Sequence, residues 1–293
     1  MKHINLIYWN EANFGDLLSP ILIQELSGRP ILYKNSTLSI KARITIIAKG
    51  ILTLRFKRIK TIIFPLQKTL LGIGSIITWG NRYSAVWGAG FMNRDETYRS
   101  SNNIYLVRGK LTDMRLKELG YKGCSNYGDP ALLLPLLYNN TTPKKNRLGI
   151  IPHWREVDDF NRLYGDKYYI INLRTRDVKK VIQEIQSCQY ILSTSLHGII
   201  VAHAYHIPAL WIEKGNIGTD GFKFHDYFSS VDIPFYDGFK NIEEILACEE
   251  NWMELFQKNM DKSTITISLN EIQKKILRSA PFPLSEKYKT VIE

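Results

Sequence analysis

The stretch Tyr190-Ile-Leu-Ser-Thr-Ser-Leu-His-Gly-Ile-Ile-Val-Ala-His-Ala-Tyr205 contains an apolar run, a turn of hydroxyl side chains and a second apolar run. An apolar run followed by residues that favour helix N-caps predicts a buried strand that leads directly into a helix. Similar strand and helix patterns alternate along the rest of the chain. This alternation predicts an α/β fold with largely parallel sheets.

The predicted elements fall into two groups. We expect strands at residues 3–9, 70–79, 85–87, 103–107, 148–152, 168–172, 190–192 and 209–212. We expect helices at residues 17–26, 111–119, 177–187 and 197–205, and a mostly helical tail over 242–277. The polar stretch Asn139-Asn-Thr-Thr-Pro-Lys-Lys-Asn146 has no apolar period and separates the two groups.

This organisation predicts two domains and a tail. We expect an N-terminal α/β domain at residues 1–143, a C-terminal α/β domain at residues 144–265, and a helical tail at residues 266–293 that packs back on the first domain. A length of 293 residues makes two domains the default expectation. Because ligands of such sheets bind outside the carboxyl ends of the strands, we expect the site in a cleft between the domains.

The net charge of +11 comes from residues 29–94. No acidic residue lies between Glu25 and Asp95, whereas twelve lysines and arginines do. A basic segment with isoleucine and leucine between the cations fits an anionic membrane surface, a nucleic acid or a phosphorylated substrate. We expect no nucleic-acid partner, because few aromatic residues interleave for base stacking. The plain alternative is a solvated basic face with buried strands behind it.

Cysteine usage and hydropathy indicate the compartment. Cys124, Cys188 and Cys248 are far apart, and no clustered Cys/His spacing predicts a metal site, which suits a reducing cytosol. The first residues lack the pattern of a signal peptide, and no run approaches the roughly 20 apolar residues of a membrane span. We expect a cytoplasmic protein, with peripheral contact to the inner face of the cytoplasmic membrane as a further option.

The turn before residue 197 is the strongest candidate for an anion site. Ser193, Thr194 or Ser195 is expected to cap the following helix, whose free N–H groups and dipole would face the cleft. Gly198 allows close approach of a ligand or of a packed neighbour. His197 can serve as acid, base or anion donor. The alternative is an ordinary capped helix whose histidine is merely hydrogen-bonded.

A second candidate is Leu106-Val-Arg-Gly-Lys-Leu-Thr-Asp113. A strand delivers Arg108 to its carboxyl end, where a guanidinium offers a planar fork for phosphate or carboxylate. Lys110 adds a second cation. The alternative is that Arg108 pairs with a nearby acid such as Asp113.

Three weaker candidates complete the set. Asn13-Phe-Gly-Asp16 makes the first strand-to-helix turn, although Asp16 could be only a cap. His153-Trp154 ends the first strand of the second group, where a cleft residue belongs. Gly221-Phe-Lys-Phe-His-Asp-Tyr-Phe228 combines aromatic side chains with Lys223 and Asp226, as sugar sites often do. The alternative is that these side chains have only a structural role.

Together these pieces resemble the polysaccharide pyruvyl transferase family. The matching stretches, in order, are Asn13-Phe-Gly-Asp16, Gly72-Ile-Gly-Ser75, Val86-Trp-Gly-Ala-Gly90, Val107-Arg-Gly109, Tyr127-Gly-Asp-Pro130, Ile151-Pro-His-Trp154, Ser193-Thr-Ser-Leu-His-Gly198 and Phe222-Lys-Phe-His-Asp-Tyr227. The resemblance implies two Rossmann-like domains in a GT-B-like arrangement. It also implies phosphoenolpyruvate as donor substrate, a pyruvate ketal on a sugar as product, phosphate release, and no cofactor.

The resemblance also implies roles for residues. In the family, residues at the positions of Arg108 and His197 contact the donor, and some members carry a second arginine where this chain has Ser195. Lys223 or Lys110 could replace that arginine. The expected substrate-binding set is Arg108, Ser193, Ser195, Leu196, Gly198, Lys223, Asn13, Asp16 and Lys110. His197 is expected to act as acid or base, with His153 or Asp226 as its partner.

The expected acceptor is a sugar of a surface polysaccharide repeat unit carried on a lipid diphosphate. The basic segment would then hold the enzyme against anionic lipid or against the diphosphate. Two other functions remain open at this point. One is a GT-B-type glycosyltransferase that uses a nucleotide sugar. The other is a non-catalytic, membrane-docked polysaccharide assembly protein.

Overall fold

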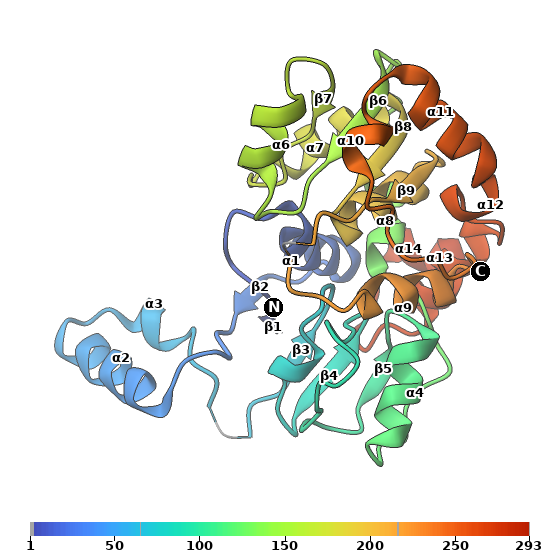
Figure 1. The fold of residues 1–293 in the computed structure, drawn as a ribbon. Helices are drawn as coiled ribbons and strands as arrows, with labels where there is room; N and C mark the ends of the chain where they lie inside the picture. Colours follow the sequence, from blue (N-terminus) through green and yellow to red (C-terminus); the bar gives the residue numbers. More distant parts are fainter. Residues whose placement is uncertain (1–2, 65, 216, 293) are drawn as a thin grey trace.

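The computed structural model describes residues 3–64, 66–215 and 217–292. Its first half is built on a five-stranded parallel sheet in the order β2-β1-β3-β4-β5 (Figure 1). The strands are β1 (Ile4–Ile7), β2 (Ile31–Tyr33), β3 (Thr69–Leu71), β4 (Ser84–Trp87) and β5 (Ile104–Leu106). Its helices are α1 (Phe14–Ser27), α2 (Ile40–Leu52), α3 (Phe56–Ile59), α4 (Lys110–Glu118) and α5 (Leu134–Leu137), with 3-10 turns at η1 (Ile77–Trp79) and η2 (Pro130–Leu133).

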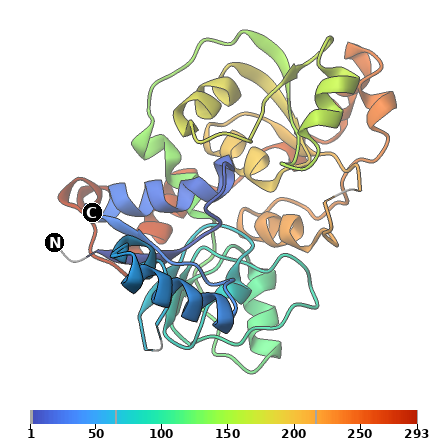
Figure 2. The same ribbon diagram turned by 90° about the vertical axis from the view of Figure 1, so that its left-hand side faces the viewer.

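The second half is built on a four-stranded parallel sheet in the order β7-β6-β8-β9. The strands are β6 (Asn146–Ile151), β7 (Tyr169–Ile170), β8 (Cys188–Ser193) and β9 (Ala209–Trp211). The helices α6 (Val157–Tyr164), α7 (Val178–Gln186) and α8 (Leu196–Ala204) connect them. In both views this sheet and its helices lie above the first sheet (Figure 1, Figure 2).

The remaining helices follow the second sheet. They are α9 (Phe222–Ser230), α10 (Ile242–Ile245), α11 (Glu249–Lys258), α12 (Met260–Ser263), α13 (Leu269–Arg278) and α14 (Glu286–Ile292). The last two contact the first half: the Trp87 indole N–H donates to the Ile276 carbonyl at 3.3 Å, and the Ser285 N–H donates to the Leu26 carbonyl at 2.7 Å. The largest apolar core runs through both halves, so the domain boundaries drawn from the sequence remain a prediction.

Local sequence explains where α1 begins and ends. The Asn13 side chain accepts a hydrogen bond from the Gly15 N–H at 3.1 Å and caps the first turn. Gly28 ends the helix with a φ of 62°, a left-handed conformation that a glycine adopts without steric cost. The predicted α/β class with parallel sheets is confirmed, as is the mostly helical tail.

Two expectations about the first half are wrong. The predicted strand at 70–79 is a strand only over Thr69–Leu71, because Gly72-Ile-Gly-Ser75 leaves the sheet as a loop. The alternative of buried strands behind the basic face fails for residues 40–60: Ile40–Leu52 is a helix, and α2 and α3 project away from the sheet (Figure 1). No helix among the described residues is long and apolar enough to cross a membrane.

The strand order fixes where a ligand can lie. In the first sheet, β1 separates β2 from β3, so the connections after β1 and β3 leave in opposite directions and open a crevice at their carboxyl ends. The same reversal occurs between β6 and β8 in the second sheet. The candidate residues lie where the chain leaves three of these strands: Asn13 and Asp16 follow β1, His153 follows β6, and His197 follows β8.

Candidate functional site

A cavity of about 290 Å³ lies where the carboxyl ends of both sheets meet. Residues from the first half that line it include Trp9, Asn13, Asp16, Gly74, Ser75, Trp79, Arg108 and Asp129. Residues from the second half and from α9 include His153, Trp154, Arg155, Ser195, Leu196, His197 and Lys223. The structure therefore brings eight of the expected site residues to one cavity: Asn13, Asp16, Arg108, His153, Ser195, Leu196, His197 and Lys223.

Arg108 is the most constrained side chain of the cavity. It is 1% exposed, and its Nη1 donates to the Ser75 hydroxyl at 2.8 Å. Its Nη2 donates to the Phe91 carbonyl. A Cβ added to Gly90 would lie 2.6 Å from the guanidinium carbon, so the glycine leaves the space that the guanidinium fills. These contacts fix the guanidinium plane at the cavity wall.

Asp226 binds the Nε side of the Arg108 guanidinium and does not line the cavity. The Arg108 Nε donates to its carboxylate at 2.9 Å. The Thr112 N–H and hydroxyl each donate to the same carboxylate at 2.7 Å. The side chains of Arg108 and Asp226 are 1% and 0% exposed, so this is a buried ion pair with its acceptors satisfied. Such a carboxylate positions the arginine.

His197 stands in the first turn of α8 and touches the other half of the molecule. A Cβ on Gly15 would lie 2.2 Å from its Nδ1, so the absence of a side chain at Gly15 makes room for the imidazole. Burial, together with the charges of Arg108, Lys223 and His153, lowers the pKa of His197 to about 3. The imidazole is neutral at pH 7, and its buried Nε2 has no hydrogen-bond partner among the described residues.

Hydrogen bonds hold the turn before α8 against the end of β6. The Ser193 hydroxyl donates to the Ile151 carbonyl at 2.8 Å and accepts from the Ser195 N–H at 3.0 Å. A Cβ on Gly198 would lie 2.4 Å from the Ser193 Oγ, so Ser193 and Gly198 pack behind the cavity wall. Ser195 and Leu196 line the cavity. The first N–H groups of α8 have no partner within the helix and offer an anion site there.

His153 is tied to the same turn. Its backbone N–H donates to the Thr194 hydroxyl at 2.6 Å, and that hydroxyl donates to the buried Glu156 carboxylate at 2.6 Å. The Arg155 N–H donates to the His153 Nδ1 at 3.3 Å. Burial, with the charges of Lys223 and Arg155, lowers the pKa of His153 to about 3. Both cavity histidines are therefore uncharged bases at neutral pH.

The two candidate lysines lie in different environments. Lys223, in the first turn of α9, is 4% exposed and lines the cavity. Burial and the charge of Arg108 lower its pKa to about 8, although Glu156 and Asp16 oppose the shift. Lys110 lies outside the cavity, half exposed, where its Nζ donates to Asp232 at 2.8 Å. Of these two lysines, Lys223 is the one that adds charge to the cavity.

Two cavity carboxyls titrate near neutrality. Burial raises the pKa of Asp16 to about 7, with Lys223 opposing the shift. Burial raises the pKa of Asp129 to about 6, and its Oδ2 has no hydrogen-bond partner in the part of the chain that the structure describes. The cavity thus combines fixed cations, neutral imidazoles and carboxyls that can exchange a proton at pH 7.

Aromatic side chains from both halves border the cavity. Trp9 and Trp154 meet edge to face with ring centroids 5.4 Å apart, and the Trp154 indole N–H donates to the Ala12 carbonyl at 3.3 Å. The aromatics of residues 221–228, considered from the sequence as a sugar site, are buried instead. Phe224 stacks on Trp211 with centroids 4.1 Å apart in the core.

Sequence reasoning did not assign Ser75, Asp129, Arg155 or Glu156 to the site. Ser75 and Asp129 lie in stretches that carried the family resemblance, and that was their only signal. Arg155 and Glu156 follow His153-Trp154 directly. Nothing in their spacing distinguishes them from surface charges, because their role depends on contacts with Lys223 and Thr194.

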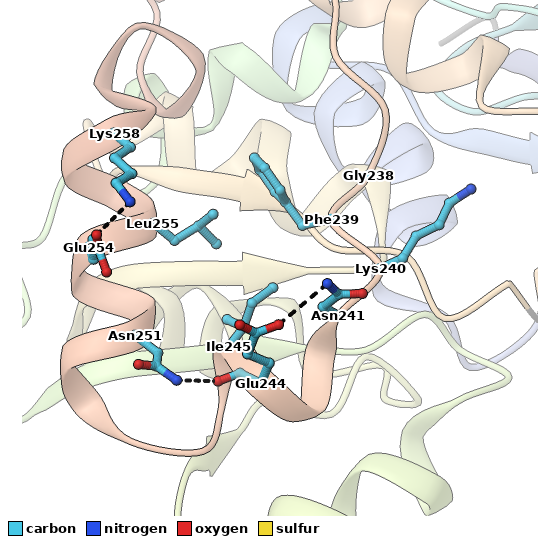
Figure 3. Close-up of a pocket in the computed structure, with 10 residues that line it drawn as sticks. All are labelled: Gly238, Phe239, Lys240, Asn241, Glu244, Ile245, Asn251, Glu254, Leu255 and Lys258. Carbon is cyan, nitrogen blue, oxygen red and sulfur yellow. Dashed lines mark hydrogen bonds and ion pairs between the residues drawn. The ribbon is translucent and has the colours of Figure 1, made fainter.

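Other parts of the described structure offer fewer reactive side chains than this cavity does. No group of three or more His, Cys, Asp or Glu side chains within them is arranged to hold a metal ion. A second hollow of about 440 Å³ lies beside α10 and α11 (Figure 3). Its polar side chains bind their own neighbours: Asn251 donates to the Glu244 carbonyl at 2.6 Å, and Lys258 pairs with Glu254 at 2.5 Å. It contains none of the candidate residues.

Comparisons with known proteins identify the family of the chain. A sequence model of the polysaccharide pyruvyl transferase family matches residues 13–215, which contain strands β2 to β9 and most of the residues that line the cavity. A curated relative, "Uncharacterized protein L143" of Acanthamoeba polyphaga mimivirus, is 32% identical over 175 residues. This match covers 55% of the chain and 59% of the relative, so the chain spans less than two thirds of that protein's length.

Two aspartates provide a matched test of the buried ion pair. We expect Asp226→Asn to lower the free energy of unfolding by about 3–5 kcal/mol, because the buried Arg108 guanidinium loses the carboxylate with which it pairs at 2.9 Å. Asp232→Asn, which breaks the exposed pair with Lys110, should cost less than about 1 kcal/mol. Urea unfolding monitored by circular dichroism measures both. Equal losses for the two variants would contradict the burial of the Arg108 pair.

Proposed function

The chain belongs to the polysaccharide pyruvyl transferase family, and we propose that it transfers the pyruvyl group of phosphoenolpyruvate to a sugar of a surface polysaccharide. The product would be a cyclic pyruvate ketal, with phosphate released. The observation that carries the proposal is the convergence of Arg108, Lys223 and the first turn of α8 on one cavity. Phosphoenolpyruvate presents a phosphate and a carboxylate on one carbon, and these groups need such donors.

We assign donor binding to three groups. Arg108 would hold one anionic group with the two Nη N–H groups that remain after its bonds to Asp226, Ser75 and the Phe91 carbonyl. The N–H groups at the start of α8, beside Ser195, would hold the other. Lys223 would supply the second cation that some relatives obtain from an arginine at the position of Ser195. Its burial and its place in the cavity support this choice over Lys110.

Proton transfers complete the proposed reaction. Protonation of the methylene carbon of the donor gives an oxocarbenium-like centre, which one sugar hydroxyl attacks. A second hydroxyl then displaces phosphate and closes the ketal. Of the two hydroxyl protons lost, one balances the proton added to carbon and the other leaves with phosphate.

Residue roles follow from charge state. Asp16, with a pKa of about 7, is suited to protonate carbon at neutral pH. His197 and His153 are neutral and can accept protons from the attacking hydroxyls. The bound phosphate would stabilise the resulting imidazolium. We assign Asp226 a positioning role through Arg108, because it does not line the cavity.

The acceptor side of the proposal concerns Trp9, Trp79 and Trp154. These side chains line the cavity, and indole rings offer flat apolar faces of the kind on which sugar rings pack. We propose a sugar acceptor carried on a lipid diphosphate at the inner face of the membrane. The two cavity walls would hold donor and acceptor against each other.

The function is tested by incubation with phosphoenolpyruvate and a panel of lipid-linked sugars. We expect a mass gain of one pyruvyl group on the acceptor and one phosphate released per transfer. His197→Ala should lower turnover at least 10²-fold through loss of acid–base catalysis, with an unchanged circular dichroism spectrum. Transfer that requires a nucleotide sugar, or full activity of His197→Ala, would contradict the assignment.

The charge of Lys223 provides a pH test of donor binding. Because burial lowers the pKa of Lys223 to about 8, its charge is present below that pH and is lost above it. We expect the affinity for phosphoenolpyruvate, measured by calorimetry, to fall as pH rises from 8 to 9.5. Lys223→Gln should weaken binding at pH 7 by about 10–100-fold. It should also reduce the dependence of the affinity on pH between 8 and 9.5.

Lys110→Gln is the matched control for this test, since Lys110 lies outside the cavity on Asp232. Its affinity should stay within about twofold of wild type, as expected for an exposed surface pair. If both lysine variants weaken binding equally, the effect comes from net charge, and Lys223 is not the second cation.

A further inference from the structure

The helical hairpin formed by residues 40–60 projects from the first half of the molecule (Figure 1). It contains α2, α3 and the turn between them. The two helices pack on each other through Gly50, where an added Cβ would lie 2.6 Å from the Ile59 side chain. Arg43 ties the base of the hairpin to the backbone carbonyls of Leu38 and Ile63.

The outer face of this hairpin is apolar and uncovered. Ile40, Ile44 and Ile51 stand on one side of α2, because positions four and eleven residues apart share a helix face. Their exposures are 77%, 62% and 56%. The exposed apolar residues continue through the turn with Leu52, Leu54 and Phe56. Isolated exposed leucines are common, but six exposed large apolar side chains on one hairpin mark an interaction surface.

The same hairpin is strongly basic. Its exposed cations are Lys41, Lys49, Arg55, Lys57, Arg58 and Lys60. None of the ion pairs among the described residues involves them. The neighbouring sequence cannot neutralise them either, since no acid occurs between Glu25 and Asp95. The partner of this surface must therefore be apolar and anionic at once.

We propose that the hairpin of residues 40–60 docks into the interface of an anionic lipid bilayer. An amphipathic helix with isoleucine on one face and lysine or arginine beside it lies in the membrane plane, its apolar face among the acyl chains and its cations on the headgroups. A second copy of the chain is a poorer partner, because pairing two such faces would bring six cations against six.

Docking would also orient the cavity. The hairpin leaves the sheet after β2, at the same carboxyl edge from which β1 runs to Trp9 and Asn13. The bilayer would therefore lie on the side of the first sheet from which its ligand-binding loops emerge. The docking itself is independent of the proposed function. Only the idea that a lipid-carried acceptor enters from this side rests on it.

Vesicle co-sedimentation of the full chain tests the proposal. Wild-type protein should bind phosphatidylcholine vesicles that contain about one third phosphatidylserine at least tenfold more tightly than pure phosphatidylcholine vesicles, and molar salt should weaken the binding. The triple variant Ile40→Gln/Ile44→Gln/Ile51→Gln should bind at least tenfold more weakly. Glutamine keeps the helix propensity of exposed positions, and thermal melting checks that the fold is retained.

A charge variant provides the second arm. Lys41→Gln/Lys49→Gln/Lys57→Gln should weaken binding by about fivefold per charge removed. Matched controls remove the same groups elsewhere: Lys122→Gln/Lys179→Gln/Lys275→Gln at exposed lysines, and Met114→Gln/Leu163→Gln/Met260→Gln at exposed apolar helix positions. Both control variants should bind like wild type.

Three results would overturn the proposal. The first is wild-type protein that ignores anionic vesicles. The second is an equal loss of binding in hairpin and control variants. The third is self-association of wild type that the isoleucine variant abolishes while vesicles bind neither, since the face would then be an interface between copies. Pyruvyl transfer by a protein that does not bind vesicles would leave the proposed function intact and remove only the docking.

Discussion

The buried ion pair between Arg108 and Asp226 is the constraint on which the site depends. A guanidinium that is 1% exposed is tolerated only where its donors are satisfied, and here they bind Asp226, Ser75 and the Phe91 carbonyl. These groups come from α9, the loop after β3 and the loop after β4. Forming the pair therefore brings α9 against the first sheet and places Lys223, one turn before Asp226, in the cavity. The pair positions the guanidinium more than it stabilises the fold, because the desolvation of both charges offsets much of their Coulomb attraction.

The charge balance of the cavity follows from this arrangement. Burial and the charges of Arg108 and Lys223 lower the pKa of His197, and no acidic side chain of the described residues opposes this shift. A bound ligand with two anionic groups would reverse that balance, since it would offset the cations and favour an imidazolium. The charges of the cavity thus fit the proposed donor. Burial raises the pKa of Asp16 to about 7 and that of Asp129 to about 6. These carboxyls can therefore exchange protons near pH 7 without a permanent negative charge that would repel the proposed ligand.

The sequence predicted the parallel strands and the residues after them, because those signals are local: apolar runs, caps and glycines. It predicted that Arg108 and His197 belong together, and the cavity contains both. It could not separate Lys223 from Lys110 or find the role of Asp226, since those depend on how α9 packs on α4, more than 100 residues away. It also missed that α2 and α3 form a projecting hairpin, because isoleucines at helical spacing beside lysines also fit strands with solvated edges. Long-range packing and exposure were the information that the sequence lacked.

The central proposal is that both halves of the molecule contact one small ligand with two anionic groups. A crystal structure of the protein soaked with phosphoenolpyruvate tests it directly. The account predicts density in the cavity with the guanidinium of Arg108 and the first turn of α8, including His197, on the same ligand. Density that contacts only one half of the molecule, or that lies outside the cavity, would contradict it.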